Sequence, residues 1–173
     1  PKSSKRPKRR STSKSTAQQK VVQNPPKIAN RLLTIMVEGQ AELPHGVVLA
    51  QGGREHGFAI HFAQGRPAFD VRVNGEVTRL TGKPITKGRF QLTATLTADE
   101  MTFAVRNGPT TRIKSPGLIP VQPKDALSIG FDDASAAGNY DSPNPFNAAA
   151  IVNTGAAVQN KKYQDGDVIV IRY

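Results

Sequence analysis

The amino-acid sequence predicts an all-β protein in which two antiparallel sheets pack face to face, as a sandwich or jelly roll. Apolar residues alternate with polar ones at the period of two that a half-buried strand requires. The alternating segments are short, and Gly, Pro, Asn or Asp separates them. No segment shows a persuasive helical period, and no pattern recurs at the fixed spacing of a repeat protein. Helical, propeller and solenoid folds are therefore disfavoured.

The chain is predicted to begin with a disordered basic linker over residues 1–26. Residues 1–20 contain eight of the 24 Lys and Arg residues and no acidic, aromatic, Val, Leu or Ile residue. Such a composition cannot bury enough apolar surface to offset the entropy of ordering. The plain interpretation is a solvated linker. The alternative is that cations of this run bind a polyanion, namely Lys5, Arg6, Lys8, Arg9 and Arg10. The run could meet nucleic acid, a nuclear import receptor or a sulfated polysaccharide, and the sequence does not choose among them. For the chain as a whole nucleic acid is an unlikely partner, because acidic and basic residues nearly balance after residue 20.

The β-sandwich domain is predicted to span residues 27–173, because the composition becomes apolar and β-branched from Lys27 onward. In chain order, we expect strands at residues 31–38, 46–51, 57–63, 69–73, 76–80, 88–98, 101–105, 127–131 and 167–173. Residues 145–166 form an uncertain insertion. Its Ala-rich part allows a helix, but Gly155 and the mixed periodicity leave a loop equally open.

Two hairpins are expected within this strand series. Asn74-Gly75 is the residue pair best suited to a two-residue turn with positive φ, so it should join the strands on either side of it. In that register Asp70 faces Arg79, as a solvent-facing pair worth a few tenths of a kcal/mol. The turn at Asp99-Glu100 should make the second hairpin, because residues 88–98 and 101–105 both alternate cleanly.

The composition excludes several classes of protein. Zero cysteines rule out a disulfide framework, a Cys-ligated metal site and a thiol nucleophile. No apolar run approaches the roughly 18 residues of a spanning helix, so no membrane insertion is expected.

Candidate binding residues lie in one glycine-rich loop and at two tyrosines. Residues 51–57 form a polar loop between two expected strands, and its Arg54 and His56 could present donors to an anionic substrate. A solvated glycine turn is the favoured alternative. Tyr140 and Tyr163 could stack on a sugar, although two isolated tyrosines do not make a platform. His45 and His61 are expected to be ordinary surface or strand residues, because neither has a partner at metal-ligand spacing.

One local cluster of acid and amide side chains could hold calcium. It consists of Asp132, Asp133, Asn139 and Asp141. Hard cations take several such oxygen ligands, but the cluster lacks EF-hand spacing, so a hydrogen-bonded turn is the favoured interpretation. Apart from this calcium no cofactor is expected.

Three stretches of the sequence carry a resemblance to a known family. They are GVVLAQGGREHGFAIHFAQGRPAFDVRVNG (46–75), SPGLIPVQPKDALSIGFDD (115–133) and GNYDSPNPF (138–146). They resemble the C-terminal laminin-G-like (concanavalin-A-like) β-sandwich domain of bacterial, planctomycete-type arylsulfatases. The resemblance implies an accessory domain that packs on its own catalytic domain upstream. It further implies that the Arg54 loop could help bind a sulfated polysaccharide, and that the protein is periplasmic or secreted.

The chain departs from that family in two respects. The family pattern has a closing strand of the form G-x-I-x-x-V soon after Phe146, whereas here the chain continues for 27 more residues, as an insertion or a replacing tail. The sulfatase motif C/S-x-P-x-R and the separate metal-ligand set are missing, so this segment is expected not to be an enzyme, although the parent protein would be a sulfuric-ester hydrolase. A freestanding carbohydrate-binding module and polyanion or nucleic-acid binding through the tail remain as alternative functions.

Overall fold

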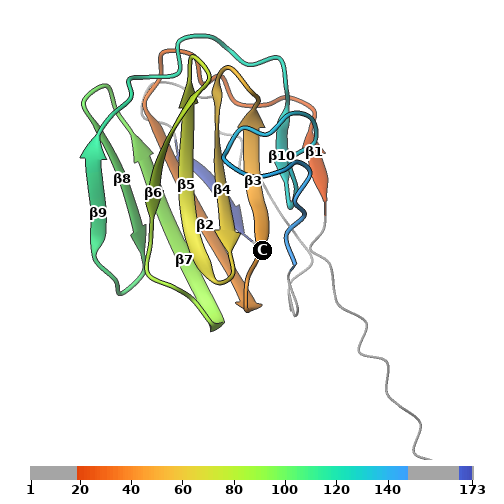
Figure 1. Ribbon diagram of the computed structural model, residues 1–173, viewed down its shortest axis with the longest axis vertical. Coiled ribbons are helices and arrows are strands. Elements are labelled where there is room, and N and C mark those ends of the chain that lie inside the picture. Colours follow the sequence, from red (N-terminus) through yellow and green to blue (C-terminus); the bar gives the residue numbers. More distant parts are fainter. Residues whose placement is uncertain (1–18, 148–167, 173) are drawn as a thin grey trace, which may run out of the picture.

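The computed structural model describes residues 19–147 and 168–172, and these residues form two stacked β-sheets without a helix (Figure 1). The predicted all-β sandwich is thereby confirmed. The strands are β1 (Lys20–Val22), β2 (Leu33–Glu42), β3 (Gly46–Gly52), β4 (Gly57–Ala63), β5 (Arg66–Val73), β6 (Glu76–Thr81), β7 (Lys87–Leu96), β8 (Glu100–Val105), β9 (Thr110–Lys114), β10 (Leu127–Ile129) and β11 (Val168–Arg172).

The first sheet has the strand order β1-β10-β3-β4-β5-β6, and each neighbouring pair is antiparallel. The turn expected at Asn74-Gly75 is present, with φ values of 52° and 82° at its two residues. Because this turn sets the register of the β5–β6 hairpin, Asp70 pairs with Arg79 as predicted.

The second sheet has the order β11-β2-β7-β8-β9. The predicted hairpin of β7 and β8 is confirmed, and the Thr97 amide donates to the Glu100 carbonyl at its turn. The last strand differs from a wholly antiparallel arrangement, because β11 pairs with β2 in parallel. The chain between Asn147 and β11, which holds most of the expected insertion, lies outside the described residues.

The structure contains two strands that the sequence did not predict. β1 lies inside the segment expected to be linker, yet it pairs with β10, and Val22 is buried in the core, so the sandwich begins before Lys27. β1 has three residues, which are too few to show alternation. β9 escaped prediction because Ile113 is its one apolar residue and is itself exposed.

The core lies between the two sheets and follows the predicted alternation. Phe58, Ile60 and Phe62 of β4 are fully buried, as are Leu92 and other inward residues of the opposite sheet. Burial of each such side chain stabilises the fold by about 1.5–3 kcal/mol.

A loop covers the outer face of the first sheet. Residues 131–147, which Figure 1 shows in blue beside β3, return across this face after β10. Ala137 packs on three small residues of the sheet, Val47, Ala50 and Ala59. The Val47 amide also donates to the Asn144 carbonyl at 2.7 Å. The loop is therefore packed on the sheet, and Phe146 near its end enters the main core.

Candidate functional site

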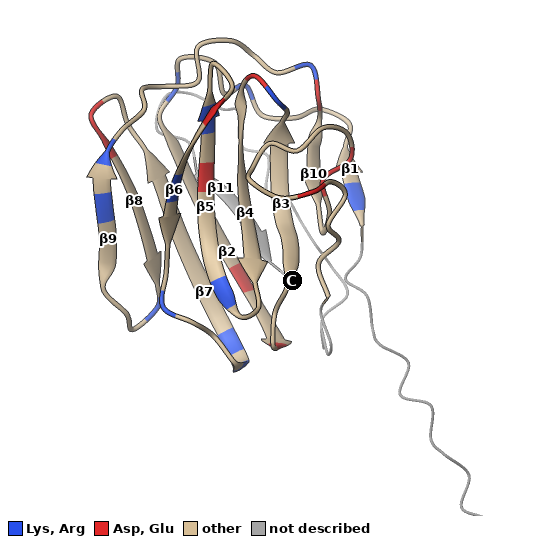
Figure 2. Cartoon of the chain, viewed as in Figure 1, with Lys and Arg blue, Asp and Glu red and all other residues tan. Residues whose placement is uncertain are grey.

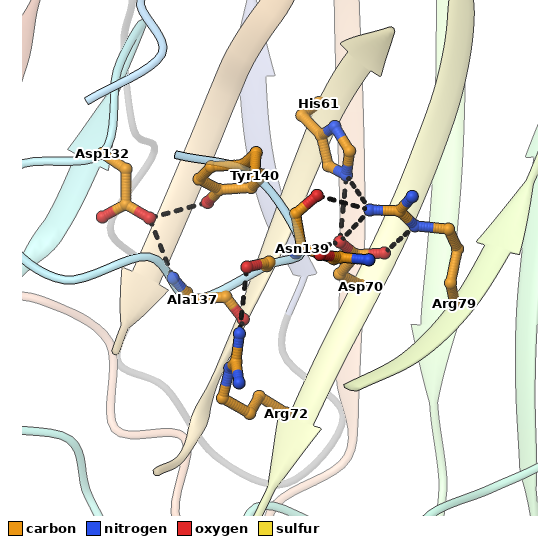
Figure 3. Close-up of polar contacts among 9 residues, drawn as sticks. His61, Asp70, Arg72, Arg79, Asp132, Ala137, Asn139 and Tyr140 are labelled. Carbon is orange, nitrogen blue, oxygen red and sulfur yellow. Dashed lines mark hydrogen bonds and ion pairs between the residues drawn. The ribbon is translucent and has the colours of Figure 1, made fainter. Parts of the chain in front are cut away.

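The polar residues of the first sheet gather beneath the covering loop. His61 on β4 and Asp70 on β5 occupy outward-facing positions between apolar residues that face the core. Arg79 on β6 does so beside the core residue Leu80. In the antiparallel register, Asp70 lies directly opposite Arg79. His61 pairs with Ala68, two residues before Asp70, so Asp70 and His61 are diagonal neighbours on the same face. The alternation of the strands thus brings three ionisable side chains to one spot (Figure 3).

Asp70 is the centre of this cluster and is fully buried. Arg79 binds it with two hydrogen bonds, from Nε to Oδ1 at 2.6 Å and from Nη2 to Oδ2 at 2.7 Å. The Asn139 amide of the covering loop donates to Oδ2 at 2.9 Å. His61 Nε2 lies 3.0 Å from Asp70 Oδ2 and 3.1 Å from Arg79 Nη2, so it donates to the carboxylate or accepts from the guanidinium according to its tautomer. The carboxylate therefore joins two strands and the loop.

These contacts decide the charge state of Asp70. Burial by itself raises the pKa of this carboxyl, because it penalises the ionised form. The hydrogen bonds from Arg79 and His61, the charge of His61 and the Asn139 amide together outweigh burial and hold the pKa far below its usual range. The hydrogen bonds to Asp70 in turn raise the pKa of Arg79. Asp70 and Arg79 are thus both charged at neutral and mildly acidic pH.

A second pair of polar side chains lies within the loop itself. The Tyr140 hydroxyl donates to Asp132 Oδ2 at 2.6 Å, and the Ala137 amide donates to the same oxygen at 3.0 Å. Burial, which is the largest influence, raises the pKa of Asp132, although these two hydrogen bonds oppose it. Burial also raises the pKa of Tyr140, and the charge of Asp132 adds to that effect. The Tyr140 ring packs edge-on against His61, with ring centroids 4.9 Å apart, so the two polar clusters are in contact.

Arg72 anchors the loop at a further point. Its guanidinium donates to the backbone carbonyls of Ala137 and Gly138, and also to that of Gly75 in the β5–β6 turn. Loop carbonyls that would otherwise lose their hydrogen bonds beside a buried surface are thereby satisfied. Figure 3 shows Arg72 and Arg79 holding the same loop segment from two sides.

One expectation for these residues is wrong: Asp70 was expected to face solvent, but it is fully buried. His61 is a strand residue, as one of the two expected alternatives had it, and it is also buried. The sequence carries one signal of the cluster: His61 interrupts an otherwise apolar strand, and Asp70 interrupts the buried apolar run from Pro67 to Val71. That pattern is typical of a strand buried on both faces, where a charged residue needs a partner.

The glycine-rich loop that contains Arg54 and His56 lies at one end of the sandwich. The Gly53 amide donates to the His56 carbonyl at 3.0 Å, and the His56 ring accepts from the Asn74 amide at 3.2 Å. The loop is thus held against the β5–β6 turn while the Arg54 side chain is exposed. Tyr140 is not part of this loop, and its hydroxyl is bound to Asp132.

The predicted calcium residues divide into one inward and three outward positions. The Asp132 side chain is buried and caps a turn, as the favoured interpretation predicted. Asp133, Asn139 and Asp141 are exposed, and Asn139 contacts the cluster through its backbone. Among residues 19–147 and 168–172, no group of three or more His, Cys, Asp or Glu side chains is placed to hold a metal ion. The tail cations at residues 5–10 lie outside the described part of the chain.

The comparisons with known proteins concern the fold. No family model and no curated protein matches the sequence. Among solved structures, domains LG4-5 of the mouse laminin α1 chain match with a TM-score of 0.55 and 10% identity, over 84% of this chain and 44% of that one. The LG1-3 region of the laminin α2 chain matches with a TM-score of 0.53 and 15% identity, over 80% of this chain and 32% of that one. This chain therefore spans less than half the length of either.

These similarities establish a laminin-G-like sandwich, as the sequence predicted. At such low identity they say nothing of ligand or activity. In the described residues there is also no helix long and apolar enough to cross a membrane.

Proposed function

We infer that this chain is a non-catalytic binding module that serves as the accessory domain of a sulfatase-like hydrolase. The observation that carries the inference is that the ionisable side chains brought together by the fold bind one another. His61, Asp70 and Arg79 form one buried cluster, and Tyr140 is bound to Asp132. Groups engaged in this way stabilise the loop and are not aimed at a substrate.

The histidines support the same conclusion. Nucleophilic hydrolysis needs a hydroxyl or thiol beside a general base. Within the described part of the chain, the ring contacts of the three histidines are to backbone amides, to Asp70, to Arg79 and to the Tyr140 ring, and none is to a Ser or Thr hydroxyl. The absence of a base and nucleophile pair favours a binding role.

The outer face of the second sheet is suited to packing on a neighbouring domain. Five uncharged, half-buried side chains on β2, β7 and β8 form part of this face, which also holds the charged residues Glu38, Arg89 and Glu100. The five are Thr34, Met36, Thr93, Thr95 and Thr102. Thr95 and Thr102 hydrogen-bond to each other across the two strands. Hydroxyls that bind each other lose little on desolvation, which supports the accessory role implied by the resemblance of the three sequence stretches.

Arg54 is the candidate contact to an anionic substrate. It is exposed on a loop whose backbone is fixed at Gly53 and His56, so a substrate would meet a pre-positioned guanidinium. The role assigned to it is to bind sulfate groups at the margin of a cleft that the catalytic domain completes.

Turnover assays test the non-catalytic part of the proposal. The purified chain should release no product above buffer from 4-nitrophenyl sulfate, 4-nitrophenyl phosphate or 4-nitrophenyl acetate, with or without added calcium. Turnover of any of these esters that is lost in Asp70→Asn would show that the buried cluster is catalytic.

Binding assays test the role of Arg54. Arg54→Gln should weaken binding to a chondroitin sulfate oligosaccharide, whereas Lys114→Gln, which removes one exposed cation from β9, serves as the matched control. Equal effects of the two substitutions would show that Arg54 contributes only non-specific attraction and is not a specific contact.

The coding sequence tests the accessory role. A C/S-x-P-x-R motif in the same reading frame, a few hundred residues upstream of Pro1, is the expected finding. A reading frame without that motif would instead favour a freestanding carbohydrate-binding module, which a glycan array can identify.

A further inference from the structure

The end of the sandwich opposite the Arg54 loop contains a hollow of about 660 Å³. Its walls come from the end of β2, the segment 83–86 that joins β6 to β7, the start of β7 and residues 105–107 after β8. Segments distant in the sequence therefore create it, and none of the sequence motifs pointed to it.

Four cations line this hollow. Lys83, Lys87, Arg89 and Arg106 are all exposed, and Figure 2 shows basic positions at the lower ends of β5 and β7 and in the connections beside them. Glu38 is the one acidic residue of the lining. Such an excess of positive charge around a concave surface concentrates anions there.

The nearby acids compensate this charge only weakly. Gln91 Nε2 donates to Glu38 Oε1 at 3.1 Å, so this carboxylate is already engaged by an amide of the lining. Lys87 Nζ lies 3.7 Å from Glu42 Oε1, with both side chains more than half exposed, which is a loose surface contact. Neither contact involves Lys83 or Arg106.

The backbone of the walls is held in place by hydrogen bonds. The Ile85 amide donates to the Gly65 carbonyl at 2.7 Å, and the Leu43 amide donates to the Thr86 carbonyl at 2.7 Å. On the other wall the Arg106 amide donates to the Gln91 carbonyl at 2.9 Å. The backbone that carries these cations is thus held in place, which lowers the entropic cost of binding a ligand.

The rest of the lining is not charged. Ile85 is half-buried and contributes apolar surface, whereas Phe90 and Val105 are almost fully buried. Phe90 fits closely over Gly39, where a Cβ atom would lie 2.7 Å from the ring. The side-chain amides of Gln40 and Asn107 complete the lining. Apolar surface, amides and several cations together match a sugar ring with hydroxyls and an anionic substituent.

We propose that this hollow is a binding site for an anionic sugar unit of a polysaccharide, in which Arg89 and Arg106 bind the sulfate or carboxylate group. The half-buried Ile85 contacts the apolar face of the ring, and the side-chain amides of Gln40 and Asn107 bind its hydroxyls. A nucleic acid suits the hollow less well, because the aromatic ring of the lining, Phe90, is only 6% exposed and cannot stack on a base. The site is independent of the proposed function, since a chain that bound nothing through Arg54 would retain it.

The test must separate the hollow from the basic tail. All variants are therefore made in the full chain with Lys5, Arg6, Lys8, Arg9 and Arg10 replaced by Gln. In this background Arg89→Gln/Arg106→Gln is compared with Lys27→Gln/Lys114→Gln, which removes two exposed cations elsewhere on the sandwich. Thermal unfolding of both variants establishes that they are folded.

Binding is measured by calorimetry at low and physiological salt, with size-defined dextran sulfate, oligogalacturonate, neutral dextran and a single-stranded DNA 12-mer. We expect Arg89→Gln/Arg106→Gln to weaken binding of the dextran sulfate or the oligogalacturonate at least tenfold, against less than twofold for the control pair. The two anionic probes show whether sulfate or carboxylate is preferred.

Three results would overturn the proposal. One is no binding of either anionic oligosaccharide in the tail-substituted background. Another is an equal loss in the two double variants, which would indicate attraction by net charge alone. The third is binding of DNA that is as tight and as sensitive to Arg89→Gln/Arg106→Gln, which would assign the hollow to nucleic acid.

Discussion

Replacement of Asp70 by Asn is the sharpest test of the buried cluster, because it removes one charge and hardly changes volume. The carboxylate accepts two hydrogen bonds from Arg79 and one from the Asn139 amide, and it lies 3.0 Å from His61 Nε2. An Asn side chain has one acceptor oxygen, and its amide group would face donors. At least one donor then loses its partner.

The magnitude follows from the burial of the two charged partners. Removal of one member of a fully buried ion pair costs about 3–5 kcal/mol. Here Asp70 is fully buried but the Arg79 side chain is 34% exposed, so water solvates part of the orphaned guanidinium. We therefore expect Asp70→Asn to lower the free energy of unfolding by about 2–4 kcal/mol. For a domain of this size that is a fall in Tm of roughly 5–15 °C.

The assay is urea unfolding of four chains: the natural sequence, Asp70→Asn, Arg79→Gln and the double variant. A coupling energy above about 1 kcal/mol in the resulting cycle would assign the loss to the Asp70 and Arg79 contact. Glu100→Gln is the matched control, since Glu100 forms an exposed pair with Arg112 at 3.3 Å and should cost less than about 1 kcal/mol. Hydrogen exchange of the Asn139 amide should also accelerate in Asp70→Asn. If Asp70→Asn cost no more than Glu100→Gln, the cluster would not hold the loop.

Three more predictions concern the same fold. The pKa of Asp70 is lower in the folded state than in the unfolded state, so the ionised side chain stabilises the fold fully above about pH 4 and less as the pH falls further. In urea unfolding between about pH 2 and 7, the free energy of unfolding should fall more steeply with acid for the natural chain than for Asp70→Asn. Tyr140→Phe leaves Asp132 with the Ala137 amide alone and should cost about 1–2 kcal/mol by thermal unfolding, and an unchanged Tm would contradict the role of that hydrogen bond. Gly52→Ala should cost at least about 1 kcal/mol more than Gly88→Ala in urea: both glycines have positive φ, but a Cβ would lie 2.2 Å from the His56 carbonyl oxygen at Gly52 and meets nothing within 4 Å at Gly88. Equal costs would show that the backbone moves to relieve the contact.

The sequence alone was enough to predict most of the strands and two hairpins, because these depend on local patterns. Polar and apolar residues alternate along most of β7, and this alternation predicts which side chains face the core. The Asn74-Gly75 turn sets the register of its hairpin, so the pairing of Asp70 with Arg79, nine residues apart in the sequence, was predictable. β9 was not predictable, because an edge strand that buries almost nothing has no apolar period.

The tertiary structure alone decided which polar residues are buried and where cations gather. Asp70 is buried because Asn139 and its neighbours, about seventy residues later, fold across the sheet, and no pattern around Asp70 records which segment will cover it. Likewise, Arg89 and Arg106 come together across the paired strands β7 and β8, and Lys83 joins them from the connection between the two sheets. Strand alternation depends on neighbours two residues apart, whereas burial and charge density depend on segments that only the packed fold brings together.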